Sequence, residues 1–151
     1  TKEAFSYLNE MLAYNPQIFD KVDYWNSHSY PNPAFSSSPT KTGQNSMRGF
    51  THELAFLKTK TNRDFQTFVT ETGWEENAST RRWLSSYYQY TSDNIWSDER
   101  VIAVTPFVLQ GDPGPFSGFS FLDKEGKPTN QYRAYQSVIK QSLDKILAAK
   151  Q

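Results

Sequence analysis

The spacing of apolar residues along the chain predicts helices that alternate with short strands. Apolar side chains recur at helical intervals in residues 1–14, 47–59 and about 80–96, and again after residue 128. Short apolar runs lie between these segments, within residues 19–30, 65–70 and 101–109. The predicted order is therefore one helix followed by three βα units.

Local signals support several of these boundaries. Asn15-Pro16 should end the first helix, and Ser79 or Thr80 should cap the third. Glu75 and Glu76 precede that cap and are expected to begin the helix, where a negative charge is favourable. The last helix should gather its apolar residues on one side: Tyr132, Tyr135, Val138, Ile139, Leu143, Ile146 and Leu147.

Strands that alternate with helices run parallel, because each helix returns the chain to the same end of the sheet. We therefore predict the α/β class, built from parallel βα units. With 151 residues the chain is long enough to bury one core. Residues 1–151 are accordingly expected to form a single unit, alone or as part of a larger one.

Polar side chains follow each predicted strand at the point where the strand ends. His28 and Tyr30 follow the first, Glu71 and Trp74 the second, and Gln110 and Asp112 the third. Active sites of parallel α/β folds are built at this edge of the sheet. These side chains are therefore expected to converge.

Glu71 is the residue in this set best suited to catalysis. It follows the apolar pair Phe68-Val69 and precedes Thr72-Gly73, so its carboxylate lies where the backbone turns sharply. A retaining glycosidase uses such a carboxylate to attack the anomeric carbon. An exposed loop glutamate is the alternative.

His28 and Tyr30 are two residues apart, so their side chains should project to the same side. An imidazole there can bind sugar hydroxyls, and a phenol can orient the carboxylate of the nucleophile. Asn26 and Gln110 are expected to add further contacts to the substrate. Ordinary polar residues at the edge of the core remain the alternative.

Composition excludes some functions and favours others. Sixteen basic residues balance 16 acidic ones, so no basic field attracts nucleic acid, and no apolar run is long enough to span a membrane. The chain has no cysteine, and His28 and His52 lack the spacing of a zinc site, so neither metal nor cofactor is expected. Four tryptophans, nine tyrosines and 11 phenylalanines suit sugar-binding clefts, whose platforms are flat rings. These features leave the compartment open between secreted and cytoplasmic.

In this combination the residues resemble the clan of retaining (β/α)8-barrel glycosidases that includes cellulase-like and β-xylosidase-like families. His28 and Tyr30 match the His-x-Tyr element after the sixth strand, and the segment 70–74 matches Thr-Glu-x-Gly-Trp after the seventh. Val104 to Phe107 and Phe119 to Pro128 match the eighth strand and its loop more loosely. The resemblance implies strands six to eight of a barrel, Glu71 as nucleophile, Tyr30 orienting it, and His28 and Trp74 binding sugar.

The sequence departs from this pattern in two places. The acid/base glutamate of the clan, in an Asn-Glu element after the fourth strand, has no counterpart, since Asn9-Glu10 lies inside a predicted helix. The tryptophan that many members carry after strand eight is replaced near Leu109 or Gln110. We therefore expect little activity from this chain alone, and either self-association or pairing with a separate N-terminal half-barrel chain. A non-catalytic carbohydrate-binding or scaffold protein is the alternative from another class, and a small flavodoxin-like binding domain is a third.

Overall fold

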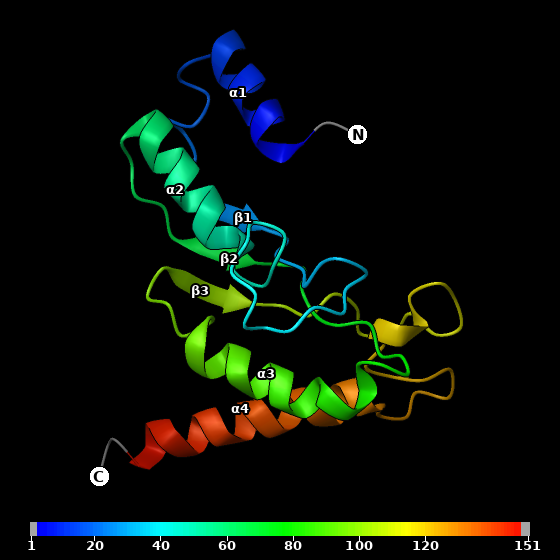
Figure 1. Cartoon of the computed structure of the whole chain (residues 1–151). Helices are drawn as coiled ribbons and strands as arrows, with labels where there is room; N and C mark the ends of the chain where they lie inside the picture. Colours follow the sequence, from blue (N-terminus) through cyan, green and yellow to red (C-terminus); the bar gives the residue numbers. More distant parts are fainter. Residues whose placement is uncertain (1–2, 149–151) are drawn as a thin grey trace.

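The computed structural model describes residues 3–148 and confirms the predicted α/β class (Figure 1). Helices and parallel strands alternate as expected, although every strand is only three or four residues long. The elements are α1 (Ala4–Tyr14), β1 (Trp25–Ser27), α2 (Gly49–Thr61), β2 (Thr67–Val69), a short 3₁₀ turn (Arg81–Trp83), α3 (Leu84–Asn94), β3 (Val101–Val104), a second 3₁₀ turn (Ser117–Phe119) and α4 (Asn130–Ala148).

The three strands form one parallel sheet in the order β1-β2-β3. Trp25 pairs with Thr67, and Val69 pairs with both Ser27 and Val104. The long connections that follow the strands extend to the same side of the molecule in Figure 1. The carboxyl ends of the strands therefore bring residues from distant parts of the chain together, as parallel βα topology requires.

The strand β3 ends five residues earlier than the apolar run suggested, at Val104 instead of Leu109. The backbone N–H of Thr105 still donates to the Val69 carbonyl, at 2.8 Å, but Pro106 has no N–H with which to continue the ladder. The side chain of Phe107 then packs against other rings of the loops. Hydrophobicity in residues 105–109 thus reflects packing of a loop and not strand pairing.

The start of α3 also differs from the sequence prediction. Neither Ser79 nor Thr80 caps the helix, because the 3₁₀ turn comes first and α3 begins only at Leu84. The Thr80 hydroxyl instead donates to the Glu75 carbonyl and accepts from the Asn77 N–H. Glu75 and Glu76 consequently lie in the preceding loop and not in the first turn of a helix.

The end of α1 follows its sequence signal, whereas the apolar side of α4 does not behave as expected. Asn15 is the C-cap of α1, and the Glu3 carboxylate caps its first turn by accepting from two backbone N–H groups. The apolar side of α4 is divided: Val138 is buried, whereas Ile139, Leu143 and Leu147 are exposed. The side chain of Ile146 lies outside the described residues.

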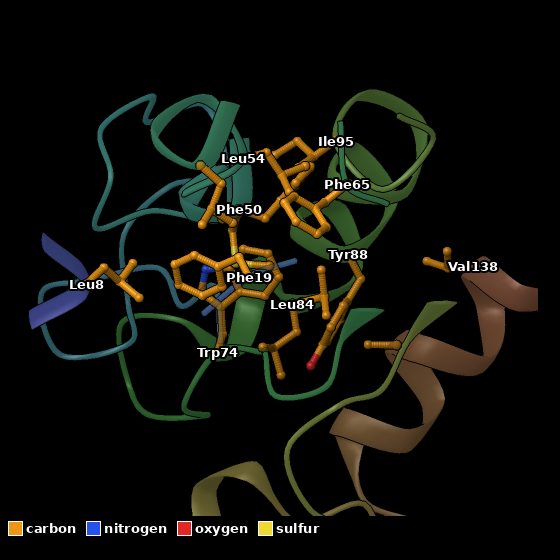
Figure 2. Close-up of a cluster of buried hydrophobic side chains, with 14 residues drawn as sticks. Leu8, Phe19, Phe50, Leu54, Phe65, Trp74, Leu84, Tyr88, Ile95 and Val138 are labelled. Atoms are coloured by element: carbon orange, nitrogen blue, oxygen red, sulfur yellow. The ribbon is translucent and has the colours of Figure 1, made fainter. Parts of the chain in front are cut away.

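A buried core joins the helices to the sheet, and ten of its side chains are labelled in Figure 2. Trp74, Tyr88 and Phe50 are the largest fully buried members. The Tyr88 hydroxyl donates to the side-chain carbonyl of Gln131, at 2.9 Å, and the Gln131 amide donates to the carbonyls of Trp74 and Gly118. The buried polar groups of Tyr88 and Gln131 are thus satisfied by hydrogen bonds inside the core, as burial requires. Among residues 3–148, no helix is both long enough and apolar enough to cross a bilayer.

Candidate active site

Glu71 lies immediately beyond β2, at the edge where the strands end. The pairing of β1 and β2 continues one residue past Val69, since the Thr70 N–H donates to the Ser27 carbonyl at 3.2 Å. Two residues after Glu71, Gly73 has a φ of 131°, which an L side chain rarely adopts, and the chain turns away. The Glu71 side chain remains 38% exposed and is therefore open to a ligand.

Two side chains from the end of β1 converge on one oxygen of this carboxylate. The Tyr30 hydroxyl donates to Oε2 of Glu71 at 3.3 Å, and Nδ1 of His28 lies 3.4 Å from the same atom. Among residues 3–148, the other carboxylate oxygen, Oε1, has no hydrogen-bond partner. One oxygen of Glu71 is thus held while the other is free to react or to bind.

The orientation of His28 and Tyr30 follows from the residues that alternate with them. Ser27 and Ser29 point inward and are almost fully buried. The Ser29 hydroxyl contacts that of Ser27 at 2.9 Å and accepts from the N–H of Phe50, in the first turn of α2, at 2.8 Å. Because the serines are fixed from the core side, the histidine and the tyrosine are directed outward toward Glu71.

The segment after Glu71 is fixed to the same strand end. Thr72 is buried, and its hydroxyl donates to the Ser29 carbonyl at 2.7 Å. Glu71 therefore lies between two anchored residues, Val69 in the sheet and Thr72 in the core. The sequence signal for this support is the Ser-x-Ser pattern within residues 27–29, whose serines were not among the predicted site residues.

A cluster of phenylalanine rings surrounds Tyr30. The rings of Phe35, Phe107 and Phe119 meet it edge-on, with centroids 5.0, 6.2 and 6.4 Å away. Burial, followed by the negative charge and the hydrogen bond of Glu71, raises the pKa of Tyr30 well above its usual value. The phenol consequently keeps its proton and remains a donor to the carboxylate up to at least its ordinary titration range.

Asn26 and Gln110, both predicted to bind substrate, occupy different environments. Asn26 is exposed on β1, and its side-chain carbonyl accepts from the hydroxyl of Thr70, next to Glu71, at 2.5 Å. Gln110 lies six residues beyond β3, and its amide donates to the Asp123 carbonyl at 2.9 Å. Asn26 therefore belongs to the neighbourhood of Glu71, whereas Gln110 fixes the loop before α4.

Trp74 is not the sugar platform that its position after β2 suggested. Its side chain is fully buried, its rings pack against Tyr87 and Tyr88, and its indole N–H donates to the Ser37 carbonyl at 2.8 Å. Figure 2 shows it inside the core cluster. The turn at Gly73 explains the difference, because it directs the next side chain away from the cleft and into the core.

Three phenylalanine rings near Tyr30 differ in their exposure. Phe119 is buried and Phe107 is partly buried, and both contact Tyr30. Phe116 is about half exposed and contacts Phe107 with a centroid distance of 5.1 Å. Of these rings, Phe116 is the one that offers open surface near the phenylalanine cluster.

Neither a second catalytic carboxyl group nor a metal site accompanies Glu71 within residues 3–148. No carboxyl group in this part of the chain shares a hydrogen bond or an ion pair with Glu71. The same residues contain no cluster of three or more histidine, aspartate or glutamate side chains that could hold a metal. The cluster thus supplies one carboxylate, one neutral donor and one imidazole.

Comparisons with known proteins give only a weak structural likeness. No family model matches the chain, and no curated protein sequence matches it. The chain is similar to a crystal structure of a mutated endo-beta-1,4-glucanase from Xanthomonas axonopodis pv. citri, at 18% identity and a TM-score of 0.48. This match covers 82% of the present chain and 40% of the glucanase chain. The chemistry of this site therefore follows from Glu71 and the side chains around it.

Proposed function

We propose that this chain supplies the nucleophile side of a retaining O-glycosidase that acts on a β-linked poly- or oligosaccharide. The observation that carries the proposal is the state of Glu71: one oxygen is held by Tyr30 and His28, and the other is free, at a strand end. The held oxygen orients the carboxylate for attack, and the free oxygen has no structural contact that would prevent it from reacting. In this proposal Asn26 and His28, which lie beside Glu71, bind hydroxyls of the sugar.

The proposed reaction has two steps. A carboxylate oxygen of Glu71 bonds to the anomeric carbon while the bond from that carbon to the glycosidic oxygen breaks, and a carboxylic acid protonates the leaving oxygen. Water then cleaves the resulting ester and restores the carboxylate. In retaining enzymes the two carboxyl groups are about 5 Å apart. We propose that this second group comes from outside the present chain.

The sheet offers a route by which another chain can supply that acid. With the strand order β1-β2-β3, β1 and β3 are both edge strands, and Ile102 on β3 is 41% exposed. Unpaired edges favour pairing with further strands. We propose that residues 1–151 form the C-terminal half of a (β/α)8 barrel, strands six to eight, whose edges pair with a second copy or with an N-terminal half-barrel chain that completes the barrel. Elution as a monomer at micromolar concentration in size-exclusion chromatography would count against self-association.

A complementation experiment tests the proposed function. The chain is mixed with a second polypeptide that carries the first five strands of a barrel and an Asn-Glu element, and release of nitrophenol from aryl β-glycosides is followed. Because a general acid typically contributes about 10²- to 10⁴-fold, the mixture should be faster than either chain by a factor in this range. A mixture no faster than the separate chains argues for the alternative below.

A non-catalytic carbohydrate-binding or scaffold protein is the second candidate function. It is favoured by one observation: among residues 3–148, no second carboxyl group shares a hydrogen bond or an ion pair with Glu71. Such a protein would bind oligosaccharides with Glu71 present or replaced and would never release an aryl group.

Replacing Tyr30 by phenylalanine tests its role as a positioning residue. The variant should slow the reaction of Glu71 with an activated glycoside by about 10- to 100-fold, since misplacement of a reacting group by about 1 Å costs this much. Because burial and Glu71 raise the pKa of Tyr30, the wild-type rate should show no loss from Tyr30 ionisation up to pH 10. Rates of dinitrophenolate release at pH 6 to 10 check both statements, and equal rates in the two proteins would remove Tyr30 from the mechanism.

A further inference from the structure

A cavity of about 300 Å³ opens beside the Glu71 cluster. His28 and Tyr30, the two residues that contact Glu71, form part of its wall. Its other walls come from the first turn of α1, the long loop between β1 and α2, and the first two turns of α2. The cavity is therefore continuous with the candidate active site but is built largely from segments that the sequence analysis did not single out.

The lining of this cavity is rich in carboxamides. Asn32, Gln44 and Asn45 all lie in the loop between β1 and α2. Among residues 3–148, the side-chain amides of Gln44 and Asn45 have no hydrogen-bond partner, and both residues are exposed. Each amide offers a donor and an acceptor at once, which is what the hydroxyl groups of a sugar require.

The charges around the cavity favour a neutral ligand. Glu3 and Glu53 line it, and His28 is the one basic side chain in its wall. Both carboxylates already have partners, since Glu3 accepts from the first turn of α1 and Oε2 of Glu53 accepts from the Trp25 indole at 2.7 Å. With two carboxylates and no lysine or arginine in the wall, an anionic ligand would be repelled, whereas hydroxyl groups can use the remaining acceptors.

Two aromatic side chains complete the lining. Phe5 from α1 and Tyr30 from the end of β1 both contribute to the wall. Aromatic side chains supply apolar surface to sites that bind polar ligands through a few placed groups. The combination of rings, free amides and carboxylates matches the mixed apolar and hydroxyl surface of a pyranose.

We infer that this cavity is a saccharide-binding subsite for neutral, hydroxyl-rich sugar units, with Gln44 and Asn45 as its specificity-determining residues. The inference rests on the proposed function, because it takes Glu71 as the group that reacts with the saccharide bound there. With this subsite, the proposed active site includes the loop between β1 and α2 in addition to the residues at the strand ends. It also predicts that polymers of uronic acids are poor ligands.

Calorimetric titration of the whole chain tests the inference. The probes are cellohexaose and xylohexaose as neutral oligosaccharides and hexagalacturonate as an acidic one. At least one neutral probe should bind, and the double variant Gln44→Ala with Asn45→Ala should weaken that binding at least tenfold. Both residues are exposed in a loop, so the variant should fold, and circular dichroism checks this.

The matched control removes two amides outside the cavity, a partly buried one and an exposed one. Gln89→Ala with Gln136→Ala, on α3 and α4, should leave binding unchanged. Tighter binding of hexagalacturonate, equal binding by the loop variant, or no binding of either neutral probe at millimolar concentration would each overturn the inference. The proposed function can fail separately. If the chain binds saccharides through Gln44 and Asn45 but no sugar ever bonds to Glu71, the subsite is supported and the assignment of Glu71 as nucleophile is wrong.

Discussion

Replacement of Glu71 by glutamine is expected to abolish the reaction of this chain with activated glycosides. A dinitrophenyl leaving group departs without protonation, so the wild-type chain should release dinitrophenolate even without a general acid. Because the second step lacks a general base, release should stop after a burst of about one equivalent. The amide cannot form the ester, and loss of a nucleophile costs on the order of 10⁴- to 10⁶-fold, so the variant should show no burst. Stopped-flow absorbance of dinitrophenolate measures this directly.

The control for this experiment is another exposed glutamate. Glu99 directly precedes Arg100 and β3, so it lies at the amino-terminal end of the strand and not at the edge that holds Glu71. Glu99→Gln should give the burst of the wild type. Equal bursts from Glu71→Gln and the wild type would mean that Glu71 is not the nucleophile.

Replacement of Trp74 by alanine is expected to destabilise the fold more than it affects any ligand. Its side chain is fully buried against Tyr87 and Tyr88 and donates to the Ser37 carbonyl. Removal of a buried tryptophan or phenylalanine side chain typically costs about 3–5 kcal/mol, since it loses packing and leaves a cavity. Urea denaturation followed by circular dichroism should therefore show a much lower midpoint. A milder variant, Trp74→Phe, keeps the measurement possible if the alanine variant does not fold.

Trp83 provides the comparison for Trp74. Its side chain is 44% exposed and stacks on Tyr87 with a centroid distance of 6.3 Å. Trp83→Ala should cost clearly less than Trp74→Ala, because less apolar area leaves the core. Unchanged stability of Trp74→Ala together with lost oligosaccharide binding would restore the sugar-platform interpretation.

Much of the fold could be predicted from apolar spacing alone. The alternation of helices and strands follows from two different periodicities, and the approach of His28 and Tyr30 to Glu71 follows from parallel topology. The end of α1 at Asn15 follows from Asn15-Pro16. Each of these features can be inferred from the order of apolar and polar residues within short segments.

The features that the sequence predicted wrongly depend on contacts between distant segments. The composition of residues 105–109 is typical of a strand. Pro106 nevertheless interrupts the hydrogen bonds between the strands, and Phe107 packs against aromatic rings of the loops. Trp74 follows Glu71 by three residues, yet the turn at Gly73 sends it into the core. Spacing from a catalytic candidate therefore does not decide which way a side chain faces.

Long-range contacts also explain what the sequence did not reveal. Ser29 matters because its hydroxyl meets the N–H of Phe50, 21 residues later in the chain. Gln44 and Asn45 lie in a loop without periodicity, and their place beside His28 and Tyr30 becomes apparent only in the folded chain. Loops are positioned by the scaffold they connect, so their functional residues are the hardest to infer from sequence.

The site of covalent labelling by an activated fluorosugar decides whether Glu71 is the nucleophile. The whole chain is incubated with dinitrophenyl 2-deoxy-2-fluoro-β-glycosides of glucose and xylose, whose glycosyl esters hydrolyse slowly, and its peptides are analysed by mass spectrometry. We expect one added fluoroglycosyl group on the peptide that contains residues 70–74, attached to Glu71 and absent from the Glu71→Gln variant. A label on another carboxylate, or no label from either sugar while the oligosaccharides bind, would contradict the assignment of Glu71 as the nucleophile.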